Sequence, residues 1–326
     1  MPRSYKELEE QLLKRLHRVM EERWGTGDAL WREVVNRQAA RLHQQHPLPV
    51  ATPLAQQVLS DLLAEGVAVF PAAGLADGAE IFERLAEQEQ RIVEAHAGEI
   101  TAERAAFAKD GRGYKGYQLN FQPGDTEDLE AGDASVRFAL HPEILGVVNA
   151  YLGLYAELRK LEYWYVLPSE RQAPMYSQLW HRDFEDISLV KVFLYLSDID
   201  EHSGPFAFVR GTHQGRLRWR DPQSIAARRT NRASDEDIAA IVPRERWFVG
   251  TGPKGTVVMA ATKGYHKGGL ATKRDRRLLT ANYFSPWCRV RYPIKRIRGI
   301  PSTAHPAMRF AARGAASRPV HSEAVA

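Results

Sequence analysis

Hydrophobic residues recur at helical spacing through the first part of the chain. Near the start, Ser4 and Glu7 match a capping box, and the apolar positions that follow are Leu8, Leu12, Leu13, Leu16 and Met20. Further helices are predicted over residues 30–43, 53–64 and 79–96, and another begins at Pro142. A proline-rich stretch at 46–49 separates the first helices from the rest. We therefore interpret residues 1–48 as an N-terminal helical extension.

Beyond residue 151 the hydrophobic pattern becomes strand-like. Short runs rich in aromatic and β-branched residues alternate with Gly, Pro, Asp and Ser, and they cover residues 161–167, 189–196, 206–209, 256–260 and 278–284. An earlier run at 66–70 is also typical of a buried strand, and 112–122 has strand-like content. Short strands with turn residues between them predict an antiparallel barrel or sandwich, with the helices packed outside it.

Two segments fall outside this regular pattern. Residues 215–246 form an insertion of about thirty residues, longer than an ordinary connection, and loops of that length are often functional lids. Its arginines are Arg216, Arg218, Arg220, Arg228, Arg229 and Arg232. We expect it to cover the active site and to contact an acidic substrate, and the alternative is a solvated surface excursion. The final segment, 301–326, has little apolar content, and we expect it to be mobile. The core domain then spans residues 49–300.

Composition and charge narrow the function classes. The 326-residue chain is 44% hydrophobic and has one cysteine, Cys288, so it can bury a large core but form no intrachain disulfide, in keeping with a cytoplasmic location. It has no run of about 18 apolar residues, and its first residues are too charged for a signal peptide. The net charge of +5 lies mostly in two segments without interleaved aromatic residues. We therefore expect neither a nucleic-acid nor a membrane partner, and the oligomeric state stays open.

The sequence His181-Arg182-Asp183 is the central candidate for a metal site. Residues i and i+2 of a strand point to the same face, so an imidazole and a carboxylate there can share one metal ion. Two other His-x-acid matches are less suitable, because His141-Pro142-Glu143 begins a helix and His321-Ser322-Glu323 lies in the expected tail. His181 and Asp183 are therefore the predicted ligands.

A site with two histidines and one carboxylate needs a second histidine from elsewhere in the fold. His266 is the leading candidate, because it follows the strand at 256–260 by a short turn and precedes another apolar strand. Arg277 lies eleven residues further along, in an apolar strand where a guanidinium needs a carboxylate partner. A dicarboxylate co-substrate would be one such partner, and a salt bridge with the nearby Asp275 is the alternative.

Taken together, these residues resemble the phytanoyl-CoA dioxygenase family of iron and 2-oxoglutarate oxygenases. In chain order, the resemblance is carried by Gln178 to Asp183, Val192 to Asp198, Ser203-Gly204-Pro205, Gly211-Thr212-His213, His266 and Arg277. It covers about residues 66–283 and implies a mainly β fold with packed helices, a double-stranded β-helix of the jelly-roll, cupin-like type. It further implies that His181, Asp183 and His266 bind Fe(II). Arg277 would bind the distal carboxylate of 2-oxoglutarate, with Phe193 as an aromatic residue near the co-substrate.

The resemblance implies an enzyme that uses Fe(II), 2-oxoglutarate and dioxygen to oxidise a small-molecule substrate, with release of succinate and CO₂. No catalytic residue beyond the metal ligands is expected, because the cofactor carries the chemistry. Asp183 favours hydroxylation or a related oxidation, since relatives that halogenate replace this carboxylate with a small residue. Gly268 stands where relatives often carry a hydroxyl residue that contacts the co-substrate.

Two other functions are compatible with the same residues. A catalytically idle β-helix protein could bind a metal or a small molecule as a sensor, although retention of the ligand set and Arg277 favours an enzyme. A metal hydrolase on a similar barrel would need a general base beside the metal-bound water, and the sequence shows no obvious one. The substrate, which the arginine-rich insertion suggests is acidic or carrier-linked, cannot be named from the sequence.

Overall fold

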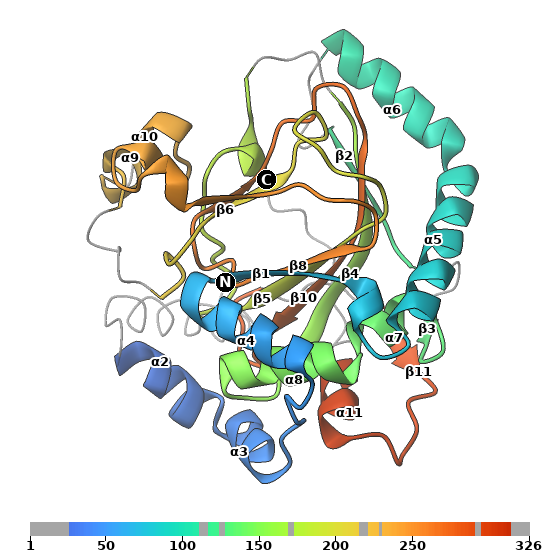
Figure 1. Ribbon diagram of the computed structural model, residues 1–326, viewed down its shortest axis with the longest axis vertical. Coiled ribbons are helices and arrows are strands. Elements are labelled where there is room, and N and C mark those ends of the chain that lie inside the picture. The colour runs from blue at the N-terminus through green and yellow to red at the C-terminus, as the bar shows by residue number, and fades with distance from the viewer. Residues whose placement is uncertain are drawn as a thin grey trace, which may run out of the picture.

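Two antiparallel sheets form the centre of the computed structural model (Figure 1). The larger sheet has the strand order β1-β8-β5-β10-β4-β2, and the smaller has the order β7-β6-β9. Their strands are β1 (Val67–Pro71), β2 (Gln118–Phe121), β4 (Glu157–Val166), β5 (Val190–Tyr195), β6 (Phe206–Val209), β7 (Trp247–Gly250), β8 (Thr256–Ala260), β9 (His266–Gly268) and β10 (Arg276–Phe284). The two sheets make the double-stranded β-helix that the resemblance implies. The structure describes residues 26–110, 117–123, 128–168, 173–214, 221–227, 230–290 and 295–313.

Helices cover the outer face of the larger sheet (Figure 1). They are α4 (Pro53–Glu65), α5 (Gly78–Ala95), α6 (Ala97–Asp110), α7 (Ala134–Ala139), α8 (Pro142–Leu152) and α11 (Pro306–Ala312). Alternate strand residues, such as Leu279 and Ala281 of β10, pack against them in the main hydrophobic core. This arrangement follows from strand geometry, because successive side chains point to opposite faces and only one face can meet the helices.

The remaining elements lie at the edges of the barrel. The N-terminal segment contains α2 (Thr26–Leu30), a π-helical turn η1 (Trp31–Val35) and α3 (Arg37–Gln45), whereas α9 (Gln223–Ala226) and α10 (Asp235–Ala239) belong to the insertion. The 3₁₀ turns are η2 (Ala72–Gly74), η3 (Tyr176–Gln178) and η5 (Arg244–Arg246), and β3 (Asp128–Glu130) pairs in parallel with β11 (Arg296–Arg298). No helix among the described residues combines the length and the hydrophobicity needed to cross a membrane.

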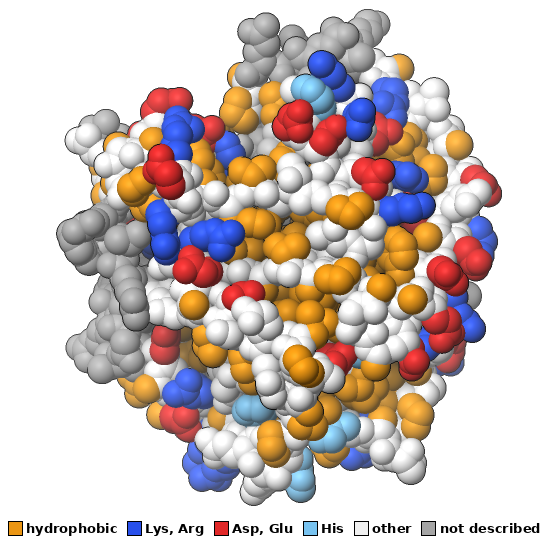
Figure 2. Space-filling view, viewed as in Figure 1, with side chains coloured by type: hydrophobic (Ala, Val, Ile, Leu, Met, Phe, Trp, Pro, Cys, Tyr) orange, Lys and Arg blue, Asp and Glu red, His pale blue; other side chains and the backbone are white. Residues whose placement is uncertain are grey.

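The inner faces of the two sheets enclose a second apolar cluster. Phe193 and Tyr195 of β5, Phe206 and Phe208 of β6, and Leu278 of β10 belong to it. In the same orientation, Figure 2 shows hydrophobic side chains gathered toward the centre of the face, with charged side chains mostly toward its periphery. The interior of the barrel is therefore the largely apolar environment in which a buried polar group requires a specific partner.

Gly66 leads α4 directly into β1, and its conformation explains the residue type. Its φ is 80°, and a Cβ at this position would lie 2.4 Å from Nδ1 of His213. Only glycine adopts this left-handed geometry without strain. His213 thus packs against the end of α4, where its Nε2 also lies 3.2 Å from the Leu63 carbonyl oxygen, in a structural position.

The C-terminal segment differs from the sequence expectation. The sequence predicts that residues 301–326 are mobile, but residues 306–312 form α11, in which Ala307, Phe310 and Ala311 are buried. Phe310 packs against Tyr155, with ring centroids 5.5 Å apart. Three small or aromatic residues on one side of a short helix were enough to attach it. The helix expected before residue 25 and the residues after 313 lie outside the described residues.

Candidate metal centre

His181, Asp183 and His266 are brought together from two separate segments. His181 and His266 face each other across an antiparallel bridge, and each backbone N–H donates to the other's carbonyl oxygen at 2.9 Å. Asp183 follows His181 by two residues, and its own N–H donates to the Thr262 carbonyl oxygen at 3.0 Å. Backbone pairing between the two segments therefore holds all three side chains on the same face of the paired segments.

The ligand atoms of this triad converge. One atom from each of the three side chains lies within 4.8 Å of the other two, and all three residues are buried. His181 Nε2 is 3.9 Å from Asp183 Oδ1, and His266 Nε2 is 3.5 Å from Asp183 Oδ2. The two imidazole rings have centroids 4.2 Å apart. This separation of donor atoms is compact enough for one metal ion to bind all three.

Hydrogen bonds and burial set the protonation states of the triad. The Nδ1 atoms of His181 and His266 lie 2.8 Å and 3.0 Å from the carbonyl oxygens of Leu179 and Gly264, so each Nδ1 carries its proton and Nε2 keeps a free lone pair. Burial lowers the pKa of both histidines. Burial acts to raise the pKa of Asp183, but electrostatic attraction, chiefly to the Lys191 ammonium, outweighs burial and lowers that pKa.

Neutral imidazoles and an ionised carboxylate are the forms that bind a metal ion. Two histidines and one carboxylate that leave open positions are the donor set of non-haem iron(II) oxygenases. The hydrogen bonds and protonation states of these residues therefore fit Fe(II).

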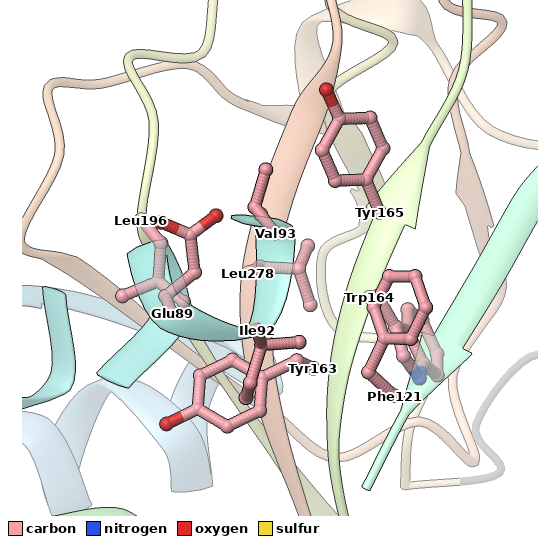
Figure 3. A pocket seen from close by; sticks show the side chains of 9 residues that line it. All are labelled: Glu89, Ile92, Val93, Phe121, Tyr163, Trp164, Tyr165, Leu196 and Leu278. Atoms are coloured by element: carbon pink, nitrogen blue, oxygen red, sulfur yellow. The ribbon is translucent and has the colours of Figure 1, made fainter. Parts of the chain in front are cut away.

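Arg277 does not face the triad. It lies on the outer side of β10, where its Nη1 donates to Glu89 Oε1 at 2.9 Å and to Oε2 at 3.2 Å. Glu89 belongs to α5 and lines a small pocket with residues of β2, β4 and β10 that contains none of the triad (Figure 3). Asp275, the partner considered from the sequence, instead accepts from Arg104 and from the Tyr165 hydroxyl. The guanidinium of Arg277 thus already has a carboxylate partner within the chain.

Arg276 is the arginine on the inner face. Leu278, two residues later, belongs to the inner cluster, so alternation along β10 puts Arg276 on the same side. Its Nη2 is 3.1 Å from the position that a Cβ on Gly268 would occupy. Gly268 follows His266 by two residues in β9, so this contact places the Arg276 guanidinium on the His266 side of that strand.

Among the described residues, part of the Arg276 guanidinium has no hydrogen-bond partner. The residue is 5% exposed, and burial lowers its pKa. Its Nη1 donates to the carbonyl oxygen of Gly204, whereas Nε has no hydrogen-bond partner among the described residues. A buried donor of this kind needs an acceptor, so the position fits a bound carboxylate.

Phe193 lies inside the barrel. It is 5% exposed and packs on Phe206 with ring centroids 5.1 Å apart, and Phe206 in turn lies 5.8 Å from the His266 ring. Phe193 is thus separated from a metal ligand by one aromatic ring, a position from which it can exclude water from the centre.

The described part of the insertion packs mainly behind the triad. Ala233, Ile238 and Val242 form an apolar cluster with Trp180 and with Tyr265, on the outer side of the smaller sheet. Trp180 and Tyr265 adjoin the ligands His181 and His266 in the sequence. Their side chains point to the opposite face from the metal site. The expected lid is therefore, in its described residues, largely a support for the ligand-bearing segments. Five of its arginines, at 216, 218, 220, 228 and 229, lie outside the described residues.

Comparison with known proteins agrees with this geometry. The family model for phytanoyl-CoA dioxygenase matches residues 76–278, which is more than half of the chain and includes the whole triad. The chain belongs to the phytanoyl-CoA dioxygenase family. Family membership and the His-Asp-His triad identify this family member as a non-haem iron(II) and 2-oxoglutarate-dependent oxygenase. A search of the curated proteins found no match.

Several solved structures are similar to this phytanoyl-CoA dioxygenase family member. The epimerase SnoN, in complex with Fe³⁺, alpha ketoglutarate and nogalamycin RO, is 19% identical over 77% of this chain and 91% of its own, with a TM-score of 0.46. EctD from S. alaskensis with bound Fe is 17% identical over 82% of this chain and 86% of its own, with a TM-score of 0.48. HygX from Streptomyces hygroscopicus, with nickel and 2-oxoglutarate bound, is 17% identical over 78% and 98%, with a TM-score of 0.46.

Sequence reasoning did not identify Lys191 as part of the centre. Its Nζ lies 2.6 Å from Asp183 Oδ2. The available signal was a lysine two residues before Phe193 in an otherwise apolar strand, because alternation puts both on the inner face.

Proposed function

We propose that the protein hydroxylates a C–H bond of a small or carrier-linked organic acid, and that Arg276 binds the distal carboxylate of 2-oxoglutarate. When bound, iron and co-substrate supply the oxidising chemistry. The chain itself provides two neutral imidazoles and one carboxylate for the metal, a buried cation for the co-substrate, and an apolar interior that excludes water. Retention of Asp183 supports hydroxylation, because halogenating relatives lack this carboxylate.

The observation that carries the co-substrate assignment is the buried guanidinium of Arg276 on the His266 face, with Nε unpaired among the described residues. A guanidinium can bind a carboxylate through two parallel N–H donors, and such a pair is strong where water is excluded. Arg277 is a weaker candidate, because Glu89 already accepts from it on the opposite face of β10. We therefore replace the sequence expectation of Arg277 by Arg276.

The test compares Arg276→Lys with Arg277→Lys, two identical changes at adjacent residues. For Arg276→Lys, the KM for 2-oxoglutarate should rise about tenfold or more, since a hydrogen bond to a charged group contributes about 1.5–3 kcal/mol and an ammonium cannot reproduce the fork. For Arg277→Lys, the KM should change by less than about threefold. Succinate release against 2-oxoglutarate concentration gives both values. The reverse pattern would return the anchor to Arg277, and no succinate from the iron-loaded wild type would contradict an oxygenase.

One arginine of the insertion supports an acidic substrate. Ala233 pairs with Trp180 through two backbone hydrogen bonds and points with it into the outer cluster. The preceding residue, Arg232, therefore lies on the opposite face, which is that of His181. In agreement, burial is the main cause that lowers the pKa of His181, and the positive charge of Arg232 contributes to the shift. We propose that Arg232 contacts a carboxylate or phosphate of the substrate.

The substrate proposal is tested in two steps. A mass-spectrometric screen of organic acids should find one that gains a single oxygen with matched succinate formation. Arg232→Gln should then reduce this coupled turnover about tenfold or more, while slow succinate release without substrate is unchanged, because the metal and co-substrate residues remain. Arg244→Gln, in the same insertion but exposed, is the control and should leave both rates unchanged. Equal coupled turnover in wild type and Arg232→Gln would remove Arg232 from the substrate site.

A further inference from the structure

Lys191 is a buried lysine inside the barrel, next to the metal-binding carboxylate. It lies in β5 opposite Asn282 of β10 and Ala260 of β8, and it is 9% exposed. Its Nζ is 2.6 Å from Asp183 Oδ2 and 3.3 Å from Glu185 Oε1. The ammonium of a lysine in the middle of a buried strand needs polar or charged partners, because burial without them is costly.

Two carboxylates face the ammonium in this environment. Both Asp183 and Glu185 lie within ion-pair distance of the Lys191 Nζ. Glu185 is itself buried, and its Oε2 accepts from the backbone N–H of Phe184 at 3.0 Å. Lys191 therefore connects a metal ligand to a second carboxylate that is held by the backbone.

The two oxygens of Asp183 have different surroundings. Oδ1 is the oxygen nearer His181 Nε2, and Oδ2 is nearer His266 Nε2 and is also the one in contact with Lys191. A carboxylate with both oxygens free can occupy two positions on a metal, whereas one with an oxygen held by an ammonium occupies one. The difference matters here, because three protein donor atoms leave three positions for a co-substrate and dioxygen.

We infer that Lys191 is a positioning residue, which holds Asp183 Oδ2 so that Asp183 supplies the metal with one oxygen and leaves room for 2-oxoglutarate. This inference rests on the metal site named in the proposed function. It has a distinctive consequence, because the same ammonium also repels the metal cation. Lys191 should therefore weaken binding of the bare metal while it strengthens binding of 2-oxoglutarate to the metal-loaded protein.

The test uses Lys191→Met, which keeps the length of the side chain without its charge, and measures binding instead of turnover. Co²⁺ titration by calorimetry should show binding about tenfold tighter than in wild type, from the loss of ammonium repulsion. Titration of the Co²⁺-loaded protein with 2-oxoglutarate should show binding about tenfold weaker. The intensity of the Co²⁺ visible absorption bands should also change, because these bands respond to the number of ligand atoms.

Two further variants separate positioning from folding. Lys191→Met removes the cation beside Glu185, so Lys191→Met/Glu185→Gln restores the charge balance and should show the same opposed changes with a wild-type melting temperature. Glu185→Gln alone keeps the ammonium on Asp183 and should bind 2-oxoglutarate within about threefold of wild type.

The outcomes distinguish this inference from the proposed function. If the wild type binds both Co²⁺ and 2-oxoglutarate but the double variant binds both equally well, or both more weakly, Lys191 does not position Asp183. If the wild type binds neither, the metal site itself is wrongly assigned.

Discussion

Asp186 joins three distant parts of the chain through one fully buried carboxylate. Its Oδ1 accepts from Trp31 Nε1 and from the Ile187 N–H, both at 2.8 Å, and its Oδ2 accepts from the Ser285 N–H at 2.8 Å. Trp31 belongs to the N-terminal segment, and Ser285 follows β10. Because Asp186 lies three residues after Asp183, these bonds fix the loop that leaves the metal centre.

The contribution of the Trp31–Asp186 hydrogen bond to stability can be tested with one substitution. Trp31→Phe removes the indole N–H and keeps an aromatic ring, and it should lower the free energy of unfolding by about 1.5–3 kcal/mol, the usual contribution of a hydrogen bond to a charged group. Trp247→Phe is the matched control, because the Trp247 Nε1 has no hydrogen-bond partner among the described residues. Urea denaturation of both variants at pH 7 gives the comparison. An equal loss in the two would show that ring size matters and the bond does not.

Residue types were easier to predict than the faces on which residues lie. The triad follows from three residue types and the two-residue spacing of His181 and Asp183, and that spacing is independent of register. The choice between Arg276 and Arg277 is different, because a shift of one residue reverses the face of a strand. The pairing of Leu278 with Tyr195 determines that face, and it is a contact between distant segments. The role of Lys191 likewise depends on a tertiary distance that no local pattern contains.

At the scale of elements, the strands were predicted where hydrophobic runs are long. The runs at 206–209 and 256–260 match β6 and β8, and the run at 278–284 lies within β10. Four short strands were missed, β3, β7, β9 and β11, because three or four residues with mixed polarity give no period-2 signal. β9 carries His266, so the sequence located the ligand but not its strand. Backbone pairing with His181 and with β6 stabilises it instead.

The insertion is an element whose role can be tested by its packing. Ile238 of α10 is fully buried in the cluster behind Trp180, so Ile238→Ala should lower the free energy of unfolding by about 2–5 kcal/mol. It should also weaken Co²⁺ binding, since Trp180 adjoins His181. Val249→Ala, at a residue that is 51% exposed, is the control and should cost less than about 0.5 kcal/mol. If the insertion were a freely opening lid, Ile238→Ala would change neither stability nor Co²⁺ binding. Thermal unfolding and metal titration of the variant therefore distinguish a lid from a packed support.

At the scale of the whole molecule, the protein buries several ionisable groups whose pKa values shift in opposite directions. Burial raises the pKa of Asp186 to about 6 and raises that of Glu89, whereas burial lowers the pKa of His181 and of His266. A carboxyl with a raised pKa binds more protons in the folded state, so its contribution to stability falls as pH rises. A histidine with a lowered pKa binds fewer, so its contribution grows as pH rises toward the unfolded value of about 6.5. These opposed contributions overlap between pH 4 and 6.5.

The Asp186 contribution can therefore be isolated only as a difference between two proteins. Between the unfolded pKa of about 4 and the folded pKa of about 6, the folded wild type holds a proton on Asp186 that the unfolded chain has lost, which lowers stability by about 1–3 kcal/mol as pH rises across this window. Asp186→Asn cannot ionise and should lack this slope, while the histidine contributions remain. Chemical denaturation of both proteins at half-unit steps from pH 4 to pH 7, each without metal, gives the two curves. Their difference should decrease steadily from pH 4 to 6 and then level off. Parallel curves would show that the three N–H donors around Asp186 already offset its burial, and that the carboxylate is ionised throughout.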